Sequence, residues 1–492
     1  MALVGKLIAG PESEPRYSRL EVEEERISAV SPLAEPAPPD APFLCPGFID
    51  THTHPIETGL QELFVDLGSC QNIKDVLESV SARLKQLGEP EVMLGFDLEP
   101  DRLVEKRYPL RQELDSACPG IPTLVYRVDG HSAALNTPGL HLALRGELPS
   151  GTELDDAGEP TGVLRGSAYE QASRAFKRRL SNDTMRRALS AAAALAARQG
   201  VTTFGALVGS DDLDEPGWRF LLDTLSALPV RAEPFLQTLH PETAANLGVP
   251  RVGGCILIDG SFGSHTAALL ADYADSGGNG VLYLSDEDLS AFIGEADRLG
   301  LQTAVHAIGD RAVDQVIRCH ESLPGHSRAR HRIEHAELLN PDLVARISSL
   351  GLVLGVQPVF EAWWGGPERL YSRRLGDRWQ QTNPWRDLLD AGVVLAGGSD
   401  APITPMNPLA GVRAALEHPN PAQRVKPDEA LAMFTTGAAF SLNLEDRVGR
   451  LEPGYQADIV LLDKDPRKDS GCRVLGSWAA GNLAWSCPEQ ED

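Results

Sequence analysis

The chain has 492 residues, more than one small domain needs and enough for a barrel of about 250 residues with a second domain beside it. Its hydrophobic content of 42% is that of an ordinary globular protein with ample core. The 70 acidic residues outnumber the 45 lysines and arginines, which gives a formal net charge of −25. That charge repels the phosphates of nucleic acids and anionic membrane surfaces, so we expect neither kind of partner.

The seven cysteines form no CxxC pair, and their odd number and wide spacing are typical of reduced thiols in a reducing compartment. The N-terminal segment lacks the long apolar stretch of a signal peptide. The sequence contains no stretch of about 18 apolar residues, so we expect no transmembrane helix. The sequence therefore predicts a soluble, cytoplasmic protein.

Both ends of the chain differ from its middle. Residues 1–46 and residues 443–492 each consist of short apparent strands separated by turn signals. Either segment alone is too small to bury a core, so we expect the two to pair as one small β-sandwich domain. Residues 60–170 are rich in turns, and we interpret them as an insertion over the mouth of the central domain.

The central segment, residues 47–442, repeats one pattern: a helical stretch ends at a glycine, and a short apolar strand follows at once. Glycine suits the left-handed residue that ends a helix, and strands that are apolar on both faces are typical of a buried parallel sheet. The repeat predicts an α/β fold, a (β/α)8 TIM barrel, although periodicity leaves an open doubly wound sheet as an alternative. The glycines are Gly200, Gly300, Gly351 and Gly392, and the clearest helix starts are Ser285 and Asn340.

Potential metal ligands stand where these strands end. His52 and His54, in PGFIDTHTHP, are two residues apart on a predicted strand and so share one face. His306, His335 and Asp400 each end a later predicted strand. A His-x-His pair by itself is weak evidence, but all five side chains would meet at one barrel mouth. Imidazole and carboxylate ligands suit a divalent metal, zinc above all, with iron, manganese and nickel as alternatives.

At this point the chain resembles a known family. PGFIDTHTHP, DGSFGSHTAAL, HAIGDRA, HRIEHAEL and GSDAPI occur in the order found in the amidohydrolase-3 (YtcJ-like) branch of the amidohydrolase superfamily, which includes N-substituted formamide deformylases. The resemblance runs nearly end to end. It implies a (β/α)8 barrel with a β-sandwich from both termini, one or two divalent ions, and the metal ligands His52, His54, His306, His335 and Asp400.

One position departs from that branch. Many members carry a lysine four residues before the Asp-Gly-Ser motif, and its carboxylated form bridges two metals. Here Cys255 stands four residues before Asp259, and no lysine occurs between Lys177 and Lys426. Either Cys255 is a thiolate ligand that bridges two ions, or it is a small buried residue beside a single ion. The sequence leaves both readings open.

Other residues are weaker candidates. His131, in an insertion motif of the branch, and His265, where the branch usually has arginine, are candidate substrate contacts, although a loop role suits both equally. Trp363 and Trp364 follow a strand and could line the pocket or simply pack. Glu334 directly precedes His335, so strand alternation predicts that it points away from the metal, toward the helices.

These features favour hydrolysis of an amide or related C–N bond of a small molecule by metal-activated hydroxide. Asp400 is expected to act as general base and then as acid toward the leaving amine. Two alternatives are a deaminase-type hydrolase with one metal, which the structural reading of Cys255 allows, and a non-catalytic scaffold, against which the complete ligand set speaks. The resemblance is also compatible with a homodimer.

Overall fold

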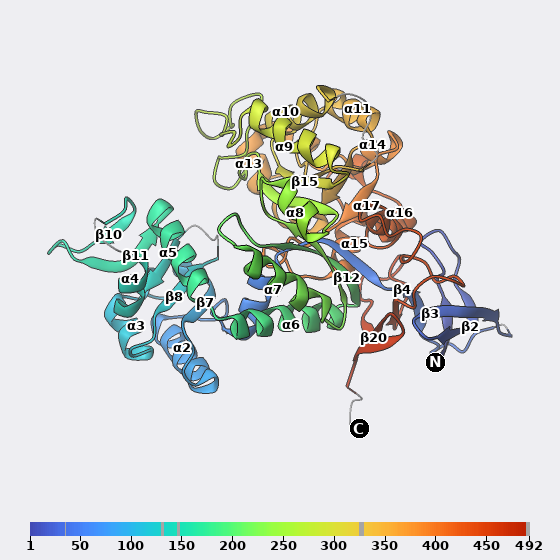
Figure 1. The fold of residues 1–492 in the computed structure, drawn as a ribbon, viewed down its shortest axis with the longest axis horizontal. Helices are drawn as coiled ribbons and strands as arrows, with labels where there is room; N and C mark the ends of the chain where they lie inside the picture. The colour runs from blue at the N-terminus through green and yellow to red at the C-terminus, as the bar shows by residue number, and fades with distance from the viewer. Residues whose placement is uncertain (35, 129–131, 145–147, 324–328, 489–492) are drawn as a thin grey trace. The chain divides into compact units, whose positions relative to one another are not determined.

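The computed structural model describes residues 1–492 except 35, 129–131, 145–147, 324–328 and 489–492. The chain divides into two compact units (Figure 1). The first unit comprises Met1–Pro55 and Ala193–Asp492, and the second comprises Ile56–Ala192.

The first unit is built around one eight-stranded sheet in which every paired neighbour is parallel. Its outer strands also meet: Thr53 bridges Ala401 in parallel, and the Asp400 amide donates to the His52 carbonyl over 2.9 Å. These contacts close the sheet into a nearly complete barrel. The predicted (β/α)8 fold is therefore confirmed, and the alternative of an open doubly wound sheet is excluded. In spatial order the strands are β18 (Leu395–Gly397), β17 (Val353–Val356), β16 (Arg332–His335), β15 (Gln302–Ala307), β14 (Arg251–Leu257), β13 (Arg231–Leu236), β12 (Val201–Val208) and β5 (Phe48–Thr53).

Helices link successive barrel strands, as the sequence pattern predicts. The helix starts are confirmed: Ser285 accepts a hydrogen bond from the Asp288 amide over 3.1 Å, and Asn340 accepts one from the Leu343 amide over 3.0 Å. The glycines expected to end helices adopt positive φ, for example 66° at Gly351. A left-handed glycine turns the chain without steric cost and frees it to enter the next strand.

The helices of this unit are α6 (Asn182–Arg198, which begins in the second unit), α7 (Glu215–Ser226), α8 (Pro241–Leu247), α9 (Asp286–Arg298), α10 (Asp310–Glu321), α11 (Pro341–Leu350), α12 (Pro358–Trp364), α13 (Leu370–Leu375), α14 (Trp385–Asp390), α15 (Pro408–Leu416), α16 (Pro427–Met433) and α17 (Thr436–Ser441), with short 3-10 turns at Gly376–Gln381 and Pro421–Gln423. Among the described residues, no helix has both the length and the apolar character to cross a membrane.

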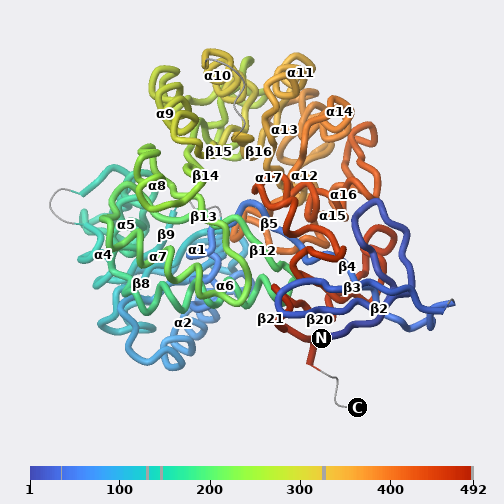
Figure 2. The backbone as a smooth tube through the Cα atoms, turned by 45° about the vertical axis from the view of Figure 1, so that its right-hand side comes forward, coloured from blue at the N-terminus to red at the C-terminus, as the bar shows by residue number. Residues whose placement is uncertain are grey.

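Strands from both chain ends pair in space, and a separate β-sandwich domain of residues 1–46 and 443–492 stays a prediction. These strands form a single seven-stranded sheet, in which β4 pairs with β19 and so connects the two ends. Strands near the N-terminus (blue) and the C-terminus (red) lie in the same region of Figure 2. In spatial order the strands are β21 (Asn482–Ser486), β20 (Val474–Ala479), β19 (Ile459–Leu462), β4 (Phe43–Pro46), β1 (Ala2–Leu7), β2 (Arg16–Glu23) and β3 (Arg26–Pro32).

The second unit has its own six-stranded sheet and its own buried apolar cluster. The predicted insertion at 60–170 falls within this unit, and its place over the barrel mouth stays a prediction. The strands are β10 (Thr152–Leu154), β11 (Pro160–Arg165), β9 (Ser132–Leu135), β8 (Thr123–Arg127), β7 (Met93–Leu98) and β6 (Val65–Asp66). The helices are α1 (Pro55–Leu63), α2 (Ile73–Leu87), α3 (Arg111–Ala117), α4 (Thr137–Ala143) and α5 (Gly166–Arg179), with a 3-10 turn at Pro100–Arg102.

Candidate metal centre

Four imidazoles, one thiol and one carboxylate gather at the carboxyl ends of the barrel strands. Three overlapping groups have ligand atoms within 4.8 Å of one another: His52, His54 and Cys255; Cys255, His306 and His335; and His52, His335 and Asp400. The sequence predicted all six as ligands, with Cys255 the open case, and the fold brings all six together. Cys255 belongs to two of the groups, so its sulfur lies between the β5 histidines and the histidines of β15 and β16.

Unusual backbone conformations aim three of these side chains. His335, with φ 73°, and Asp400, with φ 55°, are in the left-handed region that non-glycine residues rarely adopt. Cys255 lies within a bulge: Gly253 pairs with Ala304 but Ile256 pairs with Val305, so Gly254 and Cys255 are two extra residues in β14. Gly253 has φ 90°, and a Cβ on it would lie 2.3 Å from the Ala304 carbonyl oxygen, so only glycine fits there. Such a bulge re-aims the side chains of the bulged residues.

The ligand atoms lie close to one another, yet several of them have no hydrogen-bond partner among the described residues. Asp400 Oδ1 lies 3.3 Å from His52 Nε2 and 3.2 Å from His54 Nε2. Nevertheless, His52 Nε2, Asp400 Oδ1 and both ring nitrogens of His335 are buried without a hydrogen-bond partner among the described residues. Buried polar atoms are normally paired. Atoms that face a common point and leave their lone pairs open fit a metal ion, and nitrogen, sulfur and carboxylate donors suit zinc.

A buried ion pair orients His52. Glu334 Oε2 accepts a hydrogen bond from His52 Nδ1 over 2.7 Å, and Arg332 Nε donates to Glu334 Oε1 over 2.8 Å. Because β16 and β5 are not neighbours in the sheet, this bond crosses the barrel interior. A carboxylate on Nδ1 leaves Nε2 free for a metal.

The predicted direction of Glu334 is therefore wrong. Arg332 and Glu334 are two residues apart on β16, and both side chains point to the barrel interior. His335 breaks the alternation, because its positive φ turns the ring back toward the barrel axis. In the sequence, the arginine and the glutamate stand two residues apart on a predicted buried strand, and this spacing could have indicated an interior ion pair.

His306 is held in a comparable way. Its Nε2 lies 3.2 Å from the Gly260 carbonyl oxygen, while its Nδ1 lies 3.9 Å from Cys255 Sγ. Donation from Nε2–H to that carbonyl leaves Nδ1 as the lone-pair donor toward the cluster. The neighbouring Asp259 accepts hydrogen bonds from the amides of Ile308, Gly309 and Ala268, and thereby ties the loops on both sides of His306 together.

The cluster stabilises two anions. Burial raises the pKa of Asp400, but His52 and His54 outweigh burial and hold that pKa well below its usual range. Burial likewise raises the pKa of the Cys255 thiol, but His306, His335, His52 and His54 outweigh it and lower the pKa well below its usual range. Burial lowers the pKa of His54, yet Asp400 and Cys255 raise it to about 10. A buried carboxylate and thiolate need nearby positive charge, which imidazolium protons or a metal ion can supply.

The remaining predicted residues are spread more widely. His265 Nε2 pairs with Asp275 over 2.9 Å on a loop after β14, outside the groups of ligand atoms. The Trp364 ring lies 4.7 Å from that of Phe360, and the Phe360 ring stacks on His335 at 5.8 Å. Trp363 is half exposed. His131 lies outside the described residues.

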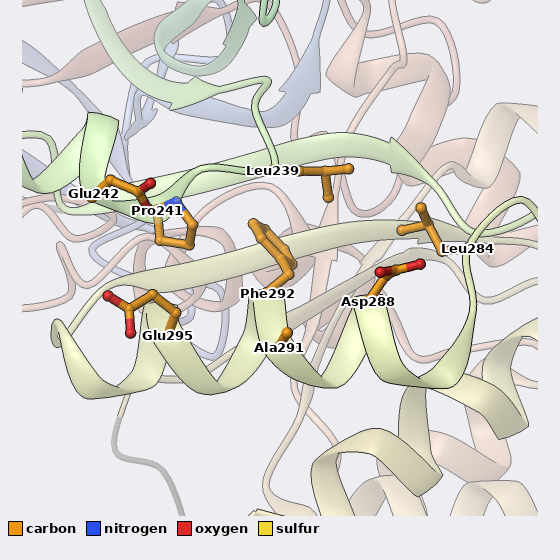
Figure 3. Close-up of a pocket in the computed structure, with 8 residues that line it drawn as sticks. All are labelled: Leu239, Pro241, Glu242, Leu284, Asp288, Ala291, Phe292 and Glu295. Carbon is orange, nitrogen blue, oxygen red and sulfur yellow. The ribbon is translucent and has the colours of Figure 1, made fainter.

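A pocket on the outer surface of the barrel is separate from this centre (Figure 3). In the close-up, Phe292 points from α9 toward Pro241 at the start of α8. The pocket contains none of the predicted site residues. Its lining consists of Leu239, Pro241, Glu242, Leu284, Asp288, Ala291, Phe292 and Glu295.

Comparison with known proteins identifies the family to which this chain belongs. The model of the amidohydrolase family matches residues 43–482, so the chain belongs to that family, in the branch that the sequence motifs indicate. The putative amidohydrolase YtcJ of Bacillus subtilis is 30% identical over 89% of this chain and 87% of its own. The N-substituted formamide deformylase of Arthrobacter pascens is 25% identical over 92% of this chain and 89% of its own.

Among solved structures, an uncharacterized metal-dependent hydrolase from Pyrococcus horikoshii is similar with a TM-score of 0.79 and 25% identity. The match covers 95% of this chain and 98% of that one. The similarity extends over the barrel and the terminal sheet together, and it supports the (β/α)8 fold.

Proposed function

We propose that this chain is a metal-dependent hydrolase that cleaves an amide or related C–N bond of a small molecule. The observation that carries the proposal is the set of six converging side chains, of which His52, His335 and Asp400 have buried polar atoms without a hydrogen-bond partner among the described residues. The relatives support the class, since one is named a metal-dependent hydrolase and another an N-substituted formamide deformylase. The name of the second relative describes hydrolysis of a formamide C–N bond.

The metal ligands in this proposal are His52, His54, His306, His335, Asp400 and Cys255. Cys255 belongs to two ligand groups, and the charges of four imidazoles favour its thiolate. We therefore favour the reading in which Cys255 is a ligand shared by two ions, over the reading in which it is a small packing residue. Zinc is the proposed metal because it combines thiolate and imidazole ligands.

A bound divalent ion would supply Lewis acidity, which activates water and polarises a carbonyl group. The chain supplies the proton transfers. Asp400 remains a carboxylate at neutral pH, so it can accept the proton of the attacking water and return it to the leaving nitrogen. Glu334 holds the His52 ring through Nδ1, and the Gly260 carbonyl holds His306 through Nε2, so both ligand nitrogens keep their direction through the reaction.

Metal analysis combined with an amide panel tests this proposal. The full chain is purified without added metal, and bound metal per chain is measured for the wild type and for Cys255→Ala. Cys319→Ala is the matched control, since Cys319 is buried in α10 away from the cluster. We expect about two ions in the wild type and in the control, and one or none in Cys255→Ala.

Hydrolysis is followed as amine released from formamides, acetamides and cyclic amides, with and without a chelator. Release that stops with the chelator and returns with zinc supports the function. One ion in wild type and Cys255→Ala alike would make Cys255 structural and favour the deaminase-type alternative. A protein that takes up neither zinc nor manganese and cleaves nothing would contradict the proposal and favour a scaffold.

A further inference from the structure

Gln357, directly after β17, is a buried carboxamide without a partner. It is 2% exposed, and neither its Oε1 nor its Nε2 has a hydrogen-bond partner among the described residues. Other buried glutamines in the barrel unit are at least half satisfied: Gln302 Nε2 donates to the carbonyls of Arg330 and Ser441 over 2.7 and 2.9 Å. Such an open group in a folded protein requires an explanation, and binding of a ligand is one.

Strand alternation gives the direction of this side chain. A Cβ on Gly355 would lie 2.1 Å from Glu334 Oε2, so the side of Gly355 faces the barrel interior, where Glu334 contacts His52. Gln357 is two residues further along and therefore lies on the same side, one layer nearer the mouth. This layer is where the strands carry the candidate metal ligands, and it is where barrel enzymes bind their substrates.

The helix that follows continues this surface with aromatic rings. Phe360 in α12 stacks on the His335 imidazole, with ring centroids 5.8 Å apart and planes 18° apart. The Trp364 ring lies edge-on to Phe360 at 4.7 Å, and Trp363 lies 6.2 Å beyond it and is 50% exposed. The rings form a continuous series from a candidate ligand to solvent.

We propose that the segment 357–364 is the substrate-binding wall of the centre, with the Gln357 carboxamide pairing an amide group and Phe360 and Trp364 packing against an aromatic or large apolar substituent of the substrate. A carboxamide offers one donor and one acceptor, which complement the C=O and N–H of an amide. Aromatic rings favour aromatic and apolar groups. The substrate class is therefore an amide with an aromatic or bulky apolar substituent. This inference rests on the proposed amide hydrolysis and specifies its substrate.

The test measures binding of two probes, acetanilide and N-methylacetamide, which share the amide and differ in the ring. Dissociation constants are obtained by ligand-observed NMR titration of the full chain, with bound metal measured in each sample. We expect Gln357→Leu to weaken both probes by about tenfold. Trp364→Leu is expected to weaken acetanilide by about fivefold and to leave N-methylacetamide unchanged. The exposed Gln380→Leu is the matched control and should bind both probes like the wild type.

Metal content and melting temperature should not change in Gln357→Leu, because the Gln357 carboxamide has no hydrogen-bond partner among the residues that the structure describes. A large fall in melting temperature would make Gln357 structural and overturn the proposal. Binding within twofold of the wild type, or a wild type that binds acetanilide no better than N-methylacetamide, would overturn it too. If the wild type cleaves amides while these outcomes occur, only the substrate wall is wrong; if it cleaves none and holds no metal, the proposed function itself fails.

Discussion

The two ends of the barrel differ in how far their buried polar side chains are paired. At the amino ends of the strands, Arg251 pairs with Glu233 over 2.7 Å, and Gln302 donates to two backbone carbonyls, although Arg251 Nε and Gln302 Oε1 have no hydrogen-bond partner among the described residues. At the carboxyl ends, His335 and Gln357 leave all of their polar side-chain atoms without a hydrogen-bond partner among the described residues. The difference separates a stabilising floor from a mouth whose groups remain open for ligands.

Arg332 and Glu334 lie in the barrel interior between the amino ends and the carboxyl ends of the strands. Both are about 1% exposed, and their ion pair is completed by the hydrogen bond to His52. A change at the mouth should therefore affect chemistry, a change at the floor should affect stability, and a change in this middle layer should affect both.

The largest effect is expected at the mouth. Asp400→Asn removes the proposed general base and should lower kcat/KM by about a thousandfold, a typical cost for losing such a group. The melting temperature should fall as well, because the buried Asp400 carboxylate lies 3.3 Å from His52 Nε2 and 3.2 Å from His54 Nε2 and balances their charge. Kinetics on the best amide of the panel, with metal content measured alongside, check this. Asp342→Asn, at a side chain 75% exposed, is the control. Retention of more than a tenth of the activity would remove Asp400 from the mechanism.

The converse effect is expected at the floor. Arg251→Met removes a buried guanidinium and its ion pair with the partly exposed Glu233, which should lower the free energy of unfolding by about 2 kcal/mol. Activity per folded molecule should stay at the wild-type level, because neither residue is at the mouth. Denaturant unfolding and activity at a low temperature measure the two quantities separately. The double variant with Glu233→Met should recover part of the stability, and a fully folded but inactive Arg251→Met protein would contradict the division between floor and mouth.

The middle layer should show a mixed effect. Glu334→Gln keeps the size of the side chain but weakens the hold on His52, so metal affinity should fall by about 10- to 100-fold. Unfolding should also become easier, because the buried Arg332 loses its counter-charge. Competition with a fluorescent zinc chelator measures the affinity, and thermal unfolding of the metal-free protein measures the stability. Unchanged zinc affinity would show that His52 needs no orienting carboxylate.

The smallest expected effect is a pH dependence of stability that arises from His320, which lies near the amino end of β16. Burial, followed by the nearby His331, lowers the pKa of His320 to about 3. The unfolded chain, with a histidine pKa near 6.5, therefore binds more protons than the folded chain between these values. Stability from this group is complete above pH 6.5 and falls as the pH drops toward 3, by about 1.4 kcal/mol from pH 7.5 to 5.5.

His320→Gln should remove that part of the pH dependence, whereas His240→Gln, at a side chain 65% exposed, should not. Denaturant unfolding of the three proteins at both pH values gives the comparison. An equal loss of stability in His320→Gln and in the wild type would assign the acid sensitivity to other groups.

Much of the fold could be read from local signals. Helix-ending glycines such as Gly351 and capping residues such as Ser285 act within one turn, so their conformations follow from the sequence. Buried parallel strands show as apolar runs, which gave the order of strands and helices. Closure is different, because the bond from the Asp400 amide to the His52 carbonyl joins strands that lie far apart in the chain.

The sequence by itself indicated which side chains could hold a metal. The histidines and Asp400 follow or end apolar strands, and parallel strands end at one rim, whereas Cys255 became a candidate because it stands where the resembled branch has a lysine. Only the tertiary structure decided where those side chains point. Three features override simple alternation: the left-handed φ of His335, the bulge that contains Cys255, and the hydrogen bond from His52 to Glu334 across the interior. Such features depend on packing between strands that are distant in the chain, and a period of two residues along one strand cannot encode them.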